Sequence, residues 1–278
     1  MIKTEIEIIT TNDTSECILA NQYSWNKKVL FDIKSHYYGV EDFKKGKSSL
    51  HNLELTLLGP IECKKLLHLQ CYFGLDTMSF SRLGAEATGV DFCDNAIEYA
   101  KELTSELKLP TIFVESNIYN LHETIHETYD LIYSSYGSIC WLPDLDVWAS
   151  HICTLLKPGG SFFLIDFHPL VISLDLLKNE IPKYSYFNSE NNLIKIIRYG
   201  TYADDRADID TIEYNWNHSI GEILDVFIKR GFSIDIFKEY PFIPMNGFPN
   251  LEKGKDGYYY FKGENKYPLL FALKVTKH

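Results

Sequence analysis

The chain has 278 residues, 45% of them hydrophobic, and a formal net charge of −11. This length is typical of one large α/β domain with insertions or of a domain with a cap, and the apolar content is enough for a sizeable core. Basic residues form no stripe, so the charge argues against a nucleic-acid partner, whose phosphates would need neutralising.

The six cysteines show neither a CxxC pair nor a regular spacing, and the N-terminus lacks the apolar core of a signal peptide. No apolar run approaches the length of a membrane span, and no spacing typical of metal ligands occurs. We therefore predict a cytoplasmic protein with reduced thiols, no membrane contact and no metal. For its oligomeric state the expectation is a monomer or a homodimer.

Residues 1–60 are polar with scattered aromatics and are expected to form a helical cap. An alternation of strands and helices then begins, in which Asp94 is expected to cap a helix and the motif Lys157–Gly160 to end one and turn the chain. The predicted strands are 64–70, 86–91, 111–115, 129–135 and 161–167, and the predicted helices are 75–83, 94–108 and 144–156.

The alternation breaks at residues 168–217, which are expected to be an insertion. A helix at 219–231 and a strand at 233–240 follow, and a loop-like stretch at 241–268 precedes a last strand at 269–277. Short turns between alternating elements predict a doubly wound, mostly parallel sheet, here of seven strands, and the two final strands predict an antiparallel pair. The expected domains are 1–60, the cap, and 61–278, an α/β domain that carries both insertions.

A glycine turn and an acidic residue mark a ligand site early in this alternation. Gly74 closes the turn after the first predicted strand, where glycine lets the backbone approach a ligand closely. Asp91 ends the next strand, and a carboxylate there can accept hydrogen bonds from both hydroxyls of a ribose. The pair predicts an adenosine-containing ligand.

From Lys64 to Lys277 the chain resembles class I S-adenosylmethionine-dependent methyltransferases. The glycine turn, Asp91, a polar residue after the third strand, the KPGG motif and the strand–strand ending come in that family's order. A bacterial subgroup that acts on small molecules of uncertain identity is resembled more narrowly, in HLQCYFGLDTMSFSRLGA, GVDF, SSYGSICWLPD, WNHSIGEIL and NQYSWNKKV. The resemblance implies a Rossmann-like methyltransferase fold and S-adenosylmethionine as the cofactor.

The glycine motif departs from the family pattern at three positions. That pattern has an acidic residue where His68 stands and glycines where Gln70 and Tyr72 stand. The ribose end of the cofactor site is therefore better supported than the methionine end. The N-terminal segment is an alternative source of residues that hold the methionine end.

Other cofactor contacts are implied by position along the chain. Asn117 could read the adenine amino group through its carbonyl oxygen or could only form a turn, and Phe92 could stack on adenine or only pack. Ser134 ends the fourth strand, where open α/β sheets place ligands. The residues expected to contact the cofactor are Gln70, Cys71, Gly74, Asp91, Phe92, Asn117, Ile118, Ser134, Trp25 and Tyr38.

The acceptor is expected to be a small molecule with an oxygen or nitrogen nucleophile. A hydroxyl acceptor needs a base, for which His168 is the first candidate, His218 the second and His36 the third, although each could be an ordinary structural histidine. Tyr136 is a further catalytic candidate, and aromatic side chains of Tyr37, Tyr38, Trp25 and Tyr136 could face the sulfonium cation. No (D/N)PP(Y/F) motif occurs.

Two other functions share parts of this pattern. A non-catalytic protein that binds an adenosyl ligand is favoured slightly by the altered glycine motif. A nicotinamide-dependent oxidoreductase shares the strand–turn–acid order, but the full GxGxxG is missing and the antiparallel ending fits it poorly.

Overall fold

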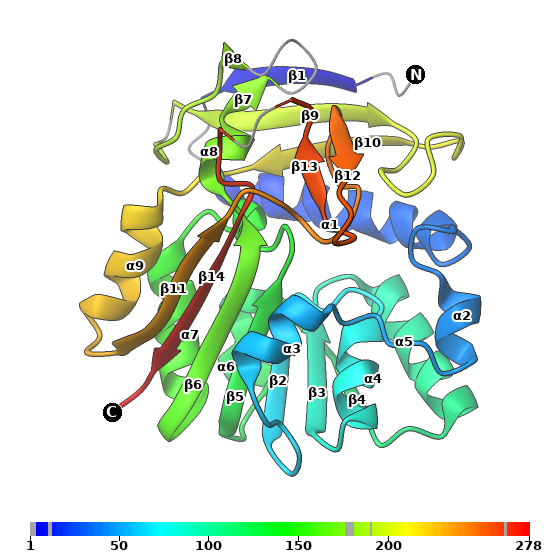
Figure 1. Ribbon diagram of the computed structural model, residues 1–278, viewed down its shortest axis with the longest axis vertical. Helices are drawn as coiled ribbons and strands as arrows, with labels where there is room; N and C mark the ends of the chain where they lie inside the picture. The colour runs from blue at the N-terminus through cyan, green and yellow to red at the C-terminus, as the bar shows by residue number, and fades with distance from the viewer. Residues whose placement is uncertain (1–3, 11–12, 176–180, 190, 264–265) are drawn as a thin grey trace.

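A computed structural model describes residues 4–10, 13–175, 181–189, 191–263 and 266–278. Its centre is a seven-stranded sheet in the order β11-β14-β6-β5-β2-β3-β4, in which β14 runs antiparallel to both neighbours and the other pairings are parallel (Figure 1). The strands are β2 (Lys65–Leu69), β3 (Glu86–Asp91), β4 (Ile112–Glu115), β5 (Tyr129–Ser135), β6 (Leu156–Phe167), β11 (Ser233–Tyr240) and β14 (Leu270–Thr276). The predicted fold class is confirmed.

Helices cover both faces of this sheet, and the side chains of its central strands β2 and β5 are accordingly buried almost throughout. Phe162 and Phe163 are neighbours in β6 but pack in different clusters, Phe162 with Trp148 and Phe227, and Phe163 with Phe80. The helices around the sheet are α3 (Asn52–Leu58), α4 (Leu75–Arg82), α5 (Asp94–Leu107), α6 (Leu121–Thr124), α7 (Leu145–Leu155) and α9 (Ile220–Ile228), with 3-10 turns η1 (Ile118–Asn120) and η2 (Ile139–Trp141).

Two local predictions are corrected. Helix α7 ends at Leu155 and β6 begins at Leu156, so the Lys157–Gly160 motif lies within the bounds of β6, where the pairing with β5 is irregular and Gly159 has a φ of 75°. Asp94 is the first residue of α5 and not its N-cap, which is Cys93.

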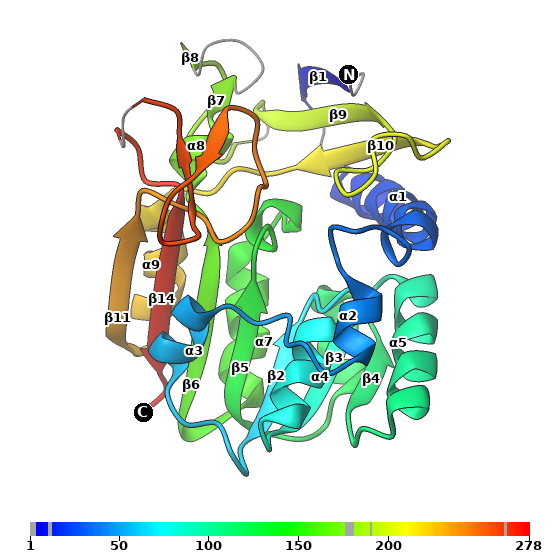
Figure 2. The ribbon, with the colours of Figure 1, turned by 45° about the vertical axis from the view of Figure 1, so that its right-hand side comes forward.

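A cap lies over the carboxyl ends of the parallel strands (Figures 1 and 2). Strands β1 (Thr4–Ile9), β9 (Leu193–Tyr199) and β10 (Asp210–Asn215) form a separate antiparallel sheet, so the N-terminal segment and the insertion after β6 share one structure. Helix α1 (Thr14–Asp32) packs between β10 and α5. The cap therefore covers the edge at which α/β sheets bind ligands.

Smaller elements complete the cap side of the molecule. The stretch after β11, expected to be loop-like, holds a short hairpin of β12 (Leu251–Lys253) and β13 (Tyr259–Phe261). The remaining elements are α2 (Val40–Lys44), α8 (Pro169–Ile172), β7 (Leu174–Asp175) and β8 (Ile181–Pro182). Over the described ranges, no helix has the length and apolar character needed to cross a membrane.

Candidate functional site

The loop between β2 and α4 keeps a glycine-type backbone without most of the glycines. Gln70, Tyr72 and Gly74 have φ angles of 54°, 52° and 78°. Left-handed backbone costs a residue with a side chain roughly 1–2 kcal/mol, a cost that glycine avoids. Gln70 and Tyr72 stand where the resemblance expects glycines, so the loop conformation is retained at an energetic cost.

Gly74 is required by packing as well as by its φ angle. A Cβ atom added here would lie 2.2 Å from the Phe113 ring, which comes from β4. The Gly74 N–H donates to Cys71 O (2.9 Å), and α4 begins at the next residue. The loop is thereby fixed against the neighbouring strands.

Asp91 connects this loop to the end of β3. Its Oδ2 accepts the Tyr72 N–H (2.8 Å) and its Oδ1 accepts the Cys93 N–H (2.9 Å). Burial raises the pKa of Asp91 to about 6, although these N–H donors act to lower it. Each carboxylate oxygen has a second lone pair, so Asp91 can still accept the hydroxyls of a ribose.

The ends of the neighbouring strands bring further predicted residues to this edge. Asn117 follows β4, and its side chain accepts the Tyr119 N–H (3.0 Å), which is the turn-forming role considered for it. Ser134 and Gln70 lie near the ends of β5 and β2, and each has a buried oxygen, Ser134 Oγ and Gln70 Oε1, without a hydrogen-bond partner. Gln70 also donates from Nε2 to Ser138 O (2.9 Å).

The remaining predicted cofactor residues differ in how far they can reach a ligand. The backbone N–H of Cys71 donates to Val90 O, and the Ile118 side chain is buried in the core. Phe92 is half-buried, and its carbonyl accepts the Gln22 Nε2 of α1 (2.6 Å). Phe92 therefore lies directly under the cap.

Aromatic side chains of the cap contact the loop. The Trp25 ring on α1 lies 5.0 Å from the Tyr72 ring and 5.2 Å from the Trp141 ring, centroid to centroid. The Tyr38 ring lies 4.7 Å from Phe73, and its hydroxyl contacts that of Tyr202. The aromatic side chains Trp25 and Tyr38 therefore pack against this loop.

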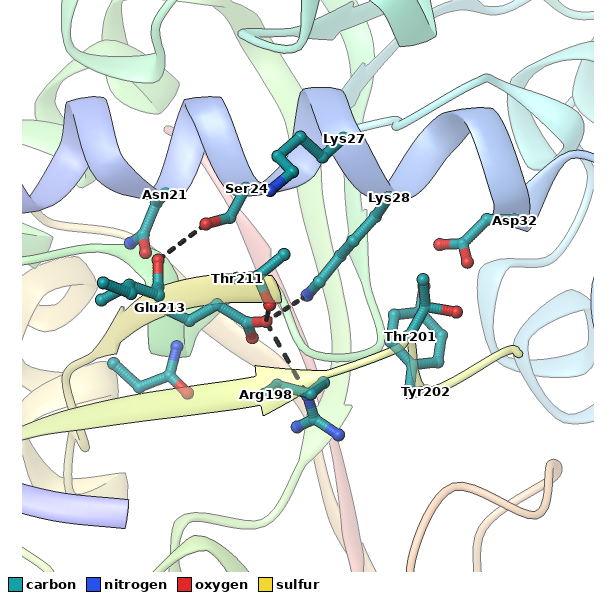
Figure 3. A network of polar contacts seen from close by, with 12 residues as sticks. Asn21, Ser24, Lys27, Lys28, Asp32, Arg198, Thr201, Tyr202, Thr211 and Glu213 are labelled. Carbon is teal, nitrogen blue, oxygen red and sulfur yellow. Dashed lines mark hydrogen bonds and ion pairs between the residues drawn. The ribbon is translucent and has the colours of Figure 1, made fainter. Parts of the chain in front are cut away.

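A buried group of charged side chains lies where α1 packs on β9 and β10 (Figure 3). Lys28 Nζ lies 2.7 Å from Glu213 Oε1 with both side chains buried, and Arg198 Nε lies 3.7 Å from the same oxygen. Burial raises the pKa of Glu213, but the charges of Lys28 and Arg198 outweigh it, so the net shift is downward. Asp32, at the end of α1, accepts the hydroxyl of Tyr72 (2.9 Å). The sequence signal for this network is the spacing of Lys28 and Asp32, one turn apart on α1.

Two of the three candidate histidines, His168 and His218, have both ring nitrogens engaged. His168 Nε2 lies 2.8 Å from Glu239 Oε1, and its Nδ1 accepts the Leu170 N–H (3.1 Å), capping α8. Burial lowers the pKa of His168, although Glu239 acts to raise it. Both ring nitrogens of the buried His218 are engaged as well, by Glu222 and by Leu142 O. His36 is exposed between α1 and α2.

Tyr136 has an acidic partner that the sequence did not reveal. Its hydroxyl donates to Glu54 of α3, which is fully buried and also accepts the His51 N–H (2.7 Å). Burial raises the pKa of Glu54 to about 8, with the Asp76 charge acting in the same direction. Tyr136 itself has a strained φ of 42° directly after β5. The only sequence signal for Glu54 is its place in the first turn of a short helix.

These residues fit an adenosyl ligand with an amino-acid arm. Asp91 keeps acceptor capacity for a ribose, and unpartnered buried oxygens of Asp32, Gln70 and Ser134 come from elements at the same edge. Buried polar atoms without partners are rare in folded proteins and often mark ligand sites. Among the described residues, no group of three or more His, Cys, Asp or Glu side chains is arranged to hold a metal ion.

The strand order, the antiparallel β14 and the acid-bound loop after β2 define the class I S-adenosylmethionine-dependent methyltransferase fold. A family model described as a methyltransferase domain matches residues 67–164. This segment runs from β2 to β6 and contains the loop, Asp91 and Ser134.

Individual relatives agree with this class. The ubiquinone biosynthesis O-methyltransferase of Proteus mirabilis is 26% identical over 127 residues, 43% of this chain and 51% of that protein, so this chain spans about half the length of that relative. A methyltransferase structure from Clostridium acetobutylicum superposes with a TM-score of 0.57 at 16% identity, over 92% of this chain and 96% of the other. One from Mesorhizobium loti gives 0.56 at 16% identity, over 84% and 100%.

Proposed function

We propose that this protein is an S-adenosylmethionine-dependent methyltransferase that acts on an oxygen or nitrogen atom of a small molecule. The observation that carries the proposal is the Asp91 carboxylate, which is held by the Tyr72 and Cys93 N–H groups at the end of β3. This arrangement leaves acceptor capacity for ribose hydroxyls where the loop backbone comes closest. The name of the Proteus relative favours oxygen as the acceptor atom.

Bound S-adenosylmethionine would supply a methyl group on a positively charged sulfur, ready for in-line displacement. The protein then has to orient the acceptor and exclude water, and orientation alone is worth about 7–11 kcal/mol in well-aligned systems. The Trp25 ring lies beside the rings of Tyr72 and Trp141, and the Lys28 ammonium already lies over it, 4.3 Å from the ring centroid. Gln70, Cys71, Gly74, Phe92, Asn117, Ile118, Ser134 and Tyr38 remain proposed cofactor contacts.

For the acceptor, Tyr136 is the best placed of the proposed catalytic residues. It lies at the end of β5 and is half-buried, with its hydroxyl bonded to Glu54. His168 and His218 remain proposed bases, but their ring nitrogens are engaged by hydrogen-bond partners. Either side chain can act as a base only in a conformation in which these hydrogen bonds are broken. Residues 1–60 and the insertions at 168–217 and 241–268 are proposed to act together as a lid. A cytoplasmic location and a monomeric or homodimeric state belong to the same proposal.

Isothermal titration with S-adenosylmethionine and S-adenosylhomocysteine tests the cofactor site. We expect saturable binding by the wild-type protein and a loss of at least about tenfold in Asp91→Asn, since a neutral amide is a weaker acceptor than a carboxylate. Thr111→Ser is the control. Thr111 directly precedes β4, and its hydroxyl donates to Ser81 of α4, so this conservative change should leave binding as in the wild type. No binding at millimolar ligand by a folded protein would contradict the proposal.

Methyl transfer itself is tested by a screen over phenols, catechols, amines and carboxylates with radiolabelled cofactor. Incorporation into any acceptor separates a methyltransferase from a non-catalytic adenosyl-ligand-binding protein, the second candidate. The engaged ring nitrogens of His168 and His218 favour that second candidate, because neither side chain is a free base in this structure. Titration with nicotinamide cofactors, for which we expect no binding, tests the third.

A further inference from the structure

Asp32 is an unusual residue for its place in the fold. It is the last residue of α1, where the partial negative charge of the helix end disfavours a carboxylate, and no basic residue lies in the last turn of α1. The side chain is fully buried, and its Oδ1 has no hydrogen-bond partner. A buried carboxylate oxygen without a partner is costly, so this position requires an explanation.

The partners that Asp32 does have leave its charge incompletely compensated. Tyr72 donates its hydroxyl to Oδ2 (2.9 Å), and Lys28, the nearest cation of the network, is engaged by Glu213 at 2.7 Å. Burial raises the pKa of Asp32, and the hydroxyls of Thr201 and Tyr72 together with the Lys28 charge only partly offset this. A further cation would satisfy both the charge and the free oxygen.

Tyr72 fixes where Asp32 lies relative to the proposed cofactor site. Its backbone N–H donates to Asp91 (2.8 Å), and its hydroxyl donates to Asp32 (2.9 Å). One side chain therefore spans from the ribose-binding carboxylate to Asp32. A ligand that binds Asp91 through its ribose must therefore extend its amino-acid arm along Tyr72 to reach Asp32.

The β2 strand offers no acid for the ammonium group of this arm. His68 is buried and bonded through Nδ1 to Thr77 Oγ1 (2.9 Å), and burial lowers its pKa to about 3, so the ring is neutral. A neutral imidazole cannot balance an ammonium charge. An acid from another element is then needed, and Asp32 reaches the loop from α1.

We propose that Asp32 binds the α-ammonium group of the cofactor's methionine end, in place of an acid on β2. The inference rests on the proposed function, since it assumes that an S-adenosyl ligand binds. Through its free Oδ1, Asp32 accepts an ammonium hydrogen, while Tyr72 holds the other carboxylate oxygen. The cap and the loop between β2 and α4 thus contact the same ligand. The buried Asp32 carboxylate gains a cationic partner when that ligand binds.

The test compares ligands with and without the amino-acid arm. Affinities of S-adenosylhomocysteine, its desamino analogue and 5′-methylthioadenosine are measured by titration for the wild type and Asp32→Asn. We expect Asp32→Asn to weaken S-adenosylhomocysteine at least about tenfold and to leave the other two ligands within about twofold. The matched control Glu16→Gln removes a carboxylate elsewhere on α1, at an exposed side chain, and should not discriminate among the three ligands.

The outcomes separate the two proposals. If the wild type binds none of the ligands, the proposed function fails, and this inference fails with it. If the wild type binds all three and Asp32→Asn lowers all affinities equally, or none, the Asp32 assignment is wrong while the cofactor site stands.

A measurement on the wild type alone guards against a variant that does not fold. Hydrogen exchange of the α1 amides near Lys28–Asp32 is followed with S-adenosylhomocysteine and with 5′-methylthioadenosine at saturation. Slower exchange with the first ligand only is expected, because only that ligand contacts Asp32. Equal protection by both ligands would overturn the assignment.

Discussion

At the scale of single residues, backbone conformation and packing decide which positions of the loop between β2 and α4 tolerate a side chain. Gln70 and Tyr72 occupy left-handed φ values, but each side chain finds a hydrogen bond, to Ser138 O and to Asp32. Gly74 has no such room, because the Phe113 ring occupies the space that a Cβ would need. This is why one of the three family glycines remains.

Replacing Gly74 by alanine should therefore destabilise the fold through both the clash and the φ angle of 78°. We expect a loss of about 2–4 kcal/mol in the free energy of unfolding, measured by urea denaturation. Gly257→Ala is the matched control, since its φ is 91° and nothing lies within 4 Å of an added Cβ. It should lose only about 1 kcal/mol. Equal losses in both variants would contradict the packing argument, whereas partial rescue by Phe113→Leu would support it.

At the scale of elements, α5 is a regular amphipathic helix with an unfavourable ending. Its C-cap, Lys108, has φ 54° and ψ 41°, a left-handed conformation that glycine adopts more readily at this position. The Lys108 side chain is exposed, so it has little packing to lose. Pro110 prevents the helix from continuing, but it does not remove the unfavourable backbone conformation of Lys108.

Lys108→Gly should raise the free energy of unfolding by about 1 kcal/mol and the melting temperature by about 2 °C. Thermal denaturation followed by circular dichroism measures the shift. Lys101→Gly, at an exposed position inside α5, is the control and should cost about 1 kcal/mol. A drop in stability for Lys108→Gly would show that the left-handed cap is not a source of strain.

At the scale of the whole molecule, several buried carboxyl groups favour the protonated state. Burial raises the pKa of each, and Glu54 is the most shifted of those with a value, to about 8. Between its ordinary pKa of 4.5 and about 8, the unfolded chain has lost a proton that the folded chain keeps. Stability therefore falls as pH rises through this window. The other groups with raised pKa are Asp32, Asp76, Asp91 and Asp166.

Glu54→Gln should remove its share of this pH dependence, because glutamine keeps the hydrogen bonds to Tyr136 and His51 without a titratable group. Urea denaturation at pH 5 to 8 should show the variant gaining stability relative to the wild type as pH rises, by at most about 4 kcal/mol over this range. The exposed Glu252 supplies the control Glu252→Gln, which should run parallel to the wild type. If the difference in unfolding free energy between Glu54→Gln and the wild type stays constant from pH 5 to pH 8, the assignment of this pH dependence to Glu54 is refuted.

The hydrophobic periodicity of the sequence and its turn-forming residues were sufficient to predict the central sheet. β3, β5 and β11 lie where their β-branched and apolar runs predict them, and α4, α5, α7 and α9 end within three residues of the predicted positions. The placement of Asp91 and Gly74 at one edge also follows from the sequence, because parallel strands bring their carboxyl ends together. Local signals carry this information, so tertiary contacts are not needed to read it.

Tertiary contacts decided what the sequence left open. β1 near the N-terminus pairs with β9, which lies far away in the sequence, and such long-range pairing leaves no local signal. His168 and His218 became structural once Glu239 and the Leu142 carbonyl were placed against them, and Glu54 acquired its shifted pKa only by burial. The sequence alone thus determined an α/β sheet with a carboxylate, Asp91, at the carboxyl end of β3. Only the tertiary structure placed Asp32 above Tyr72, because helix α1 reaches the loop through packing and not through sequence proximity.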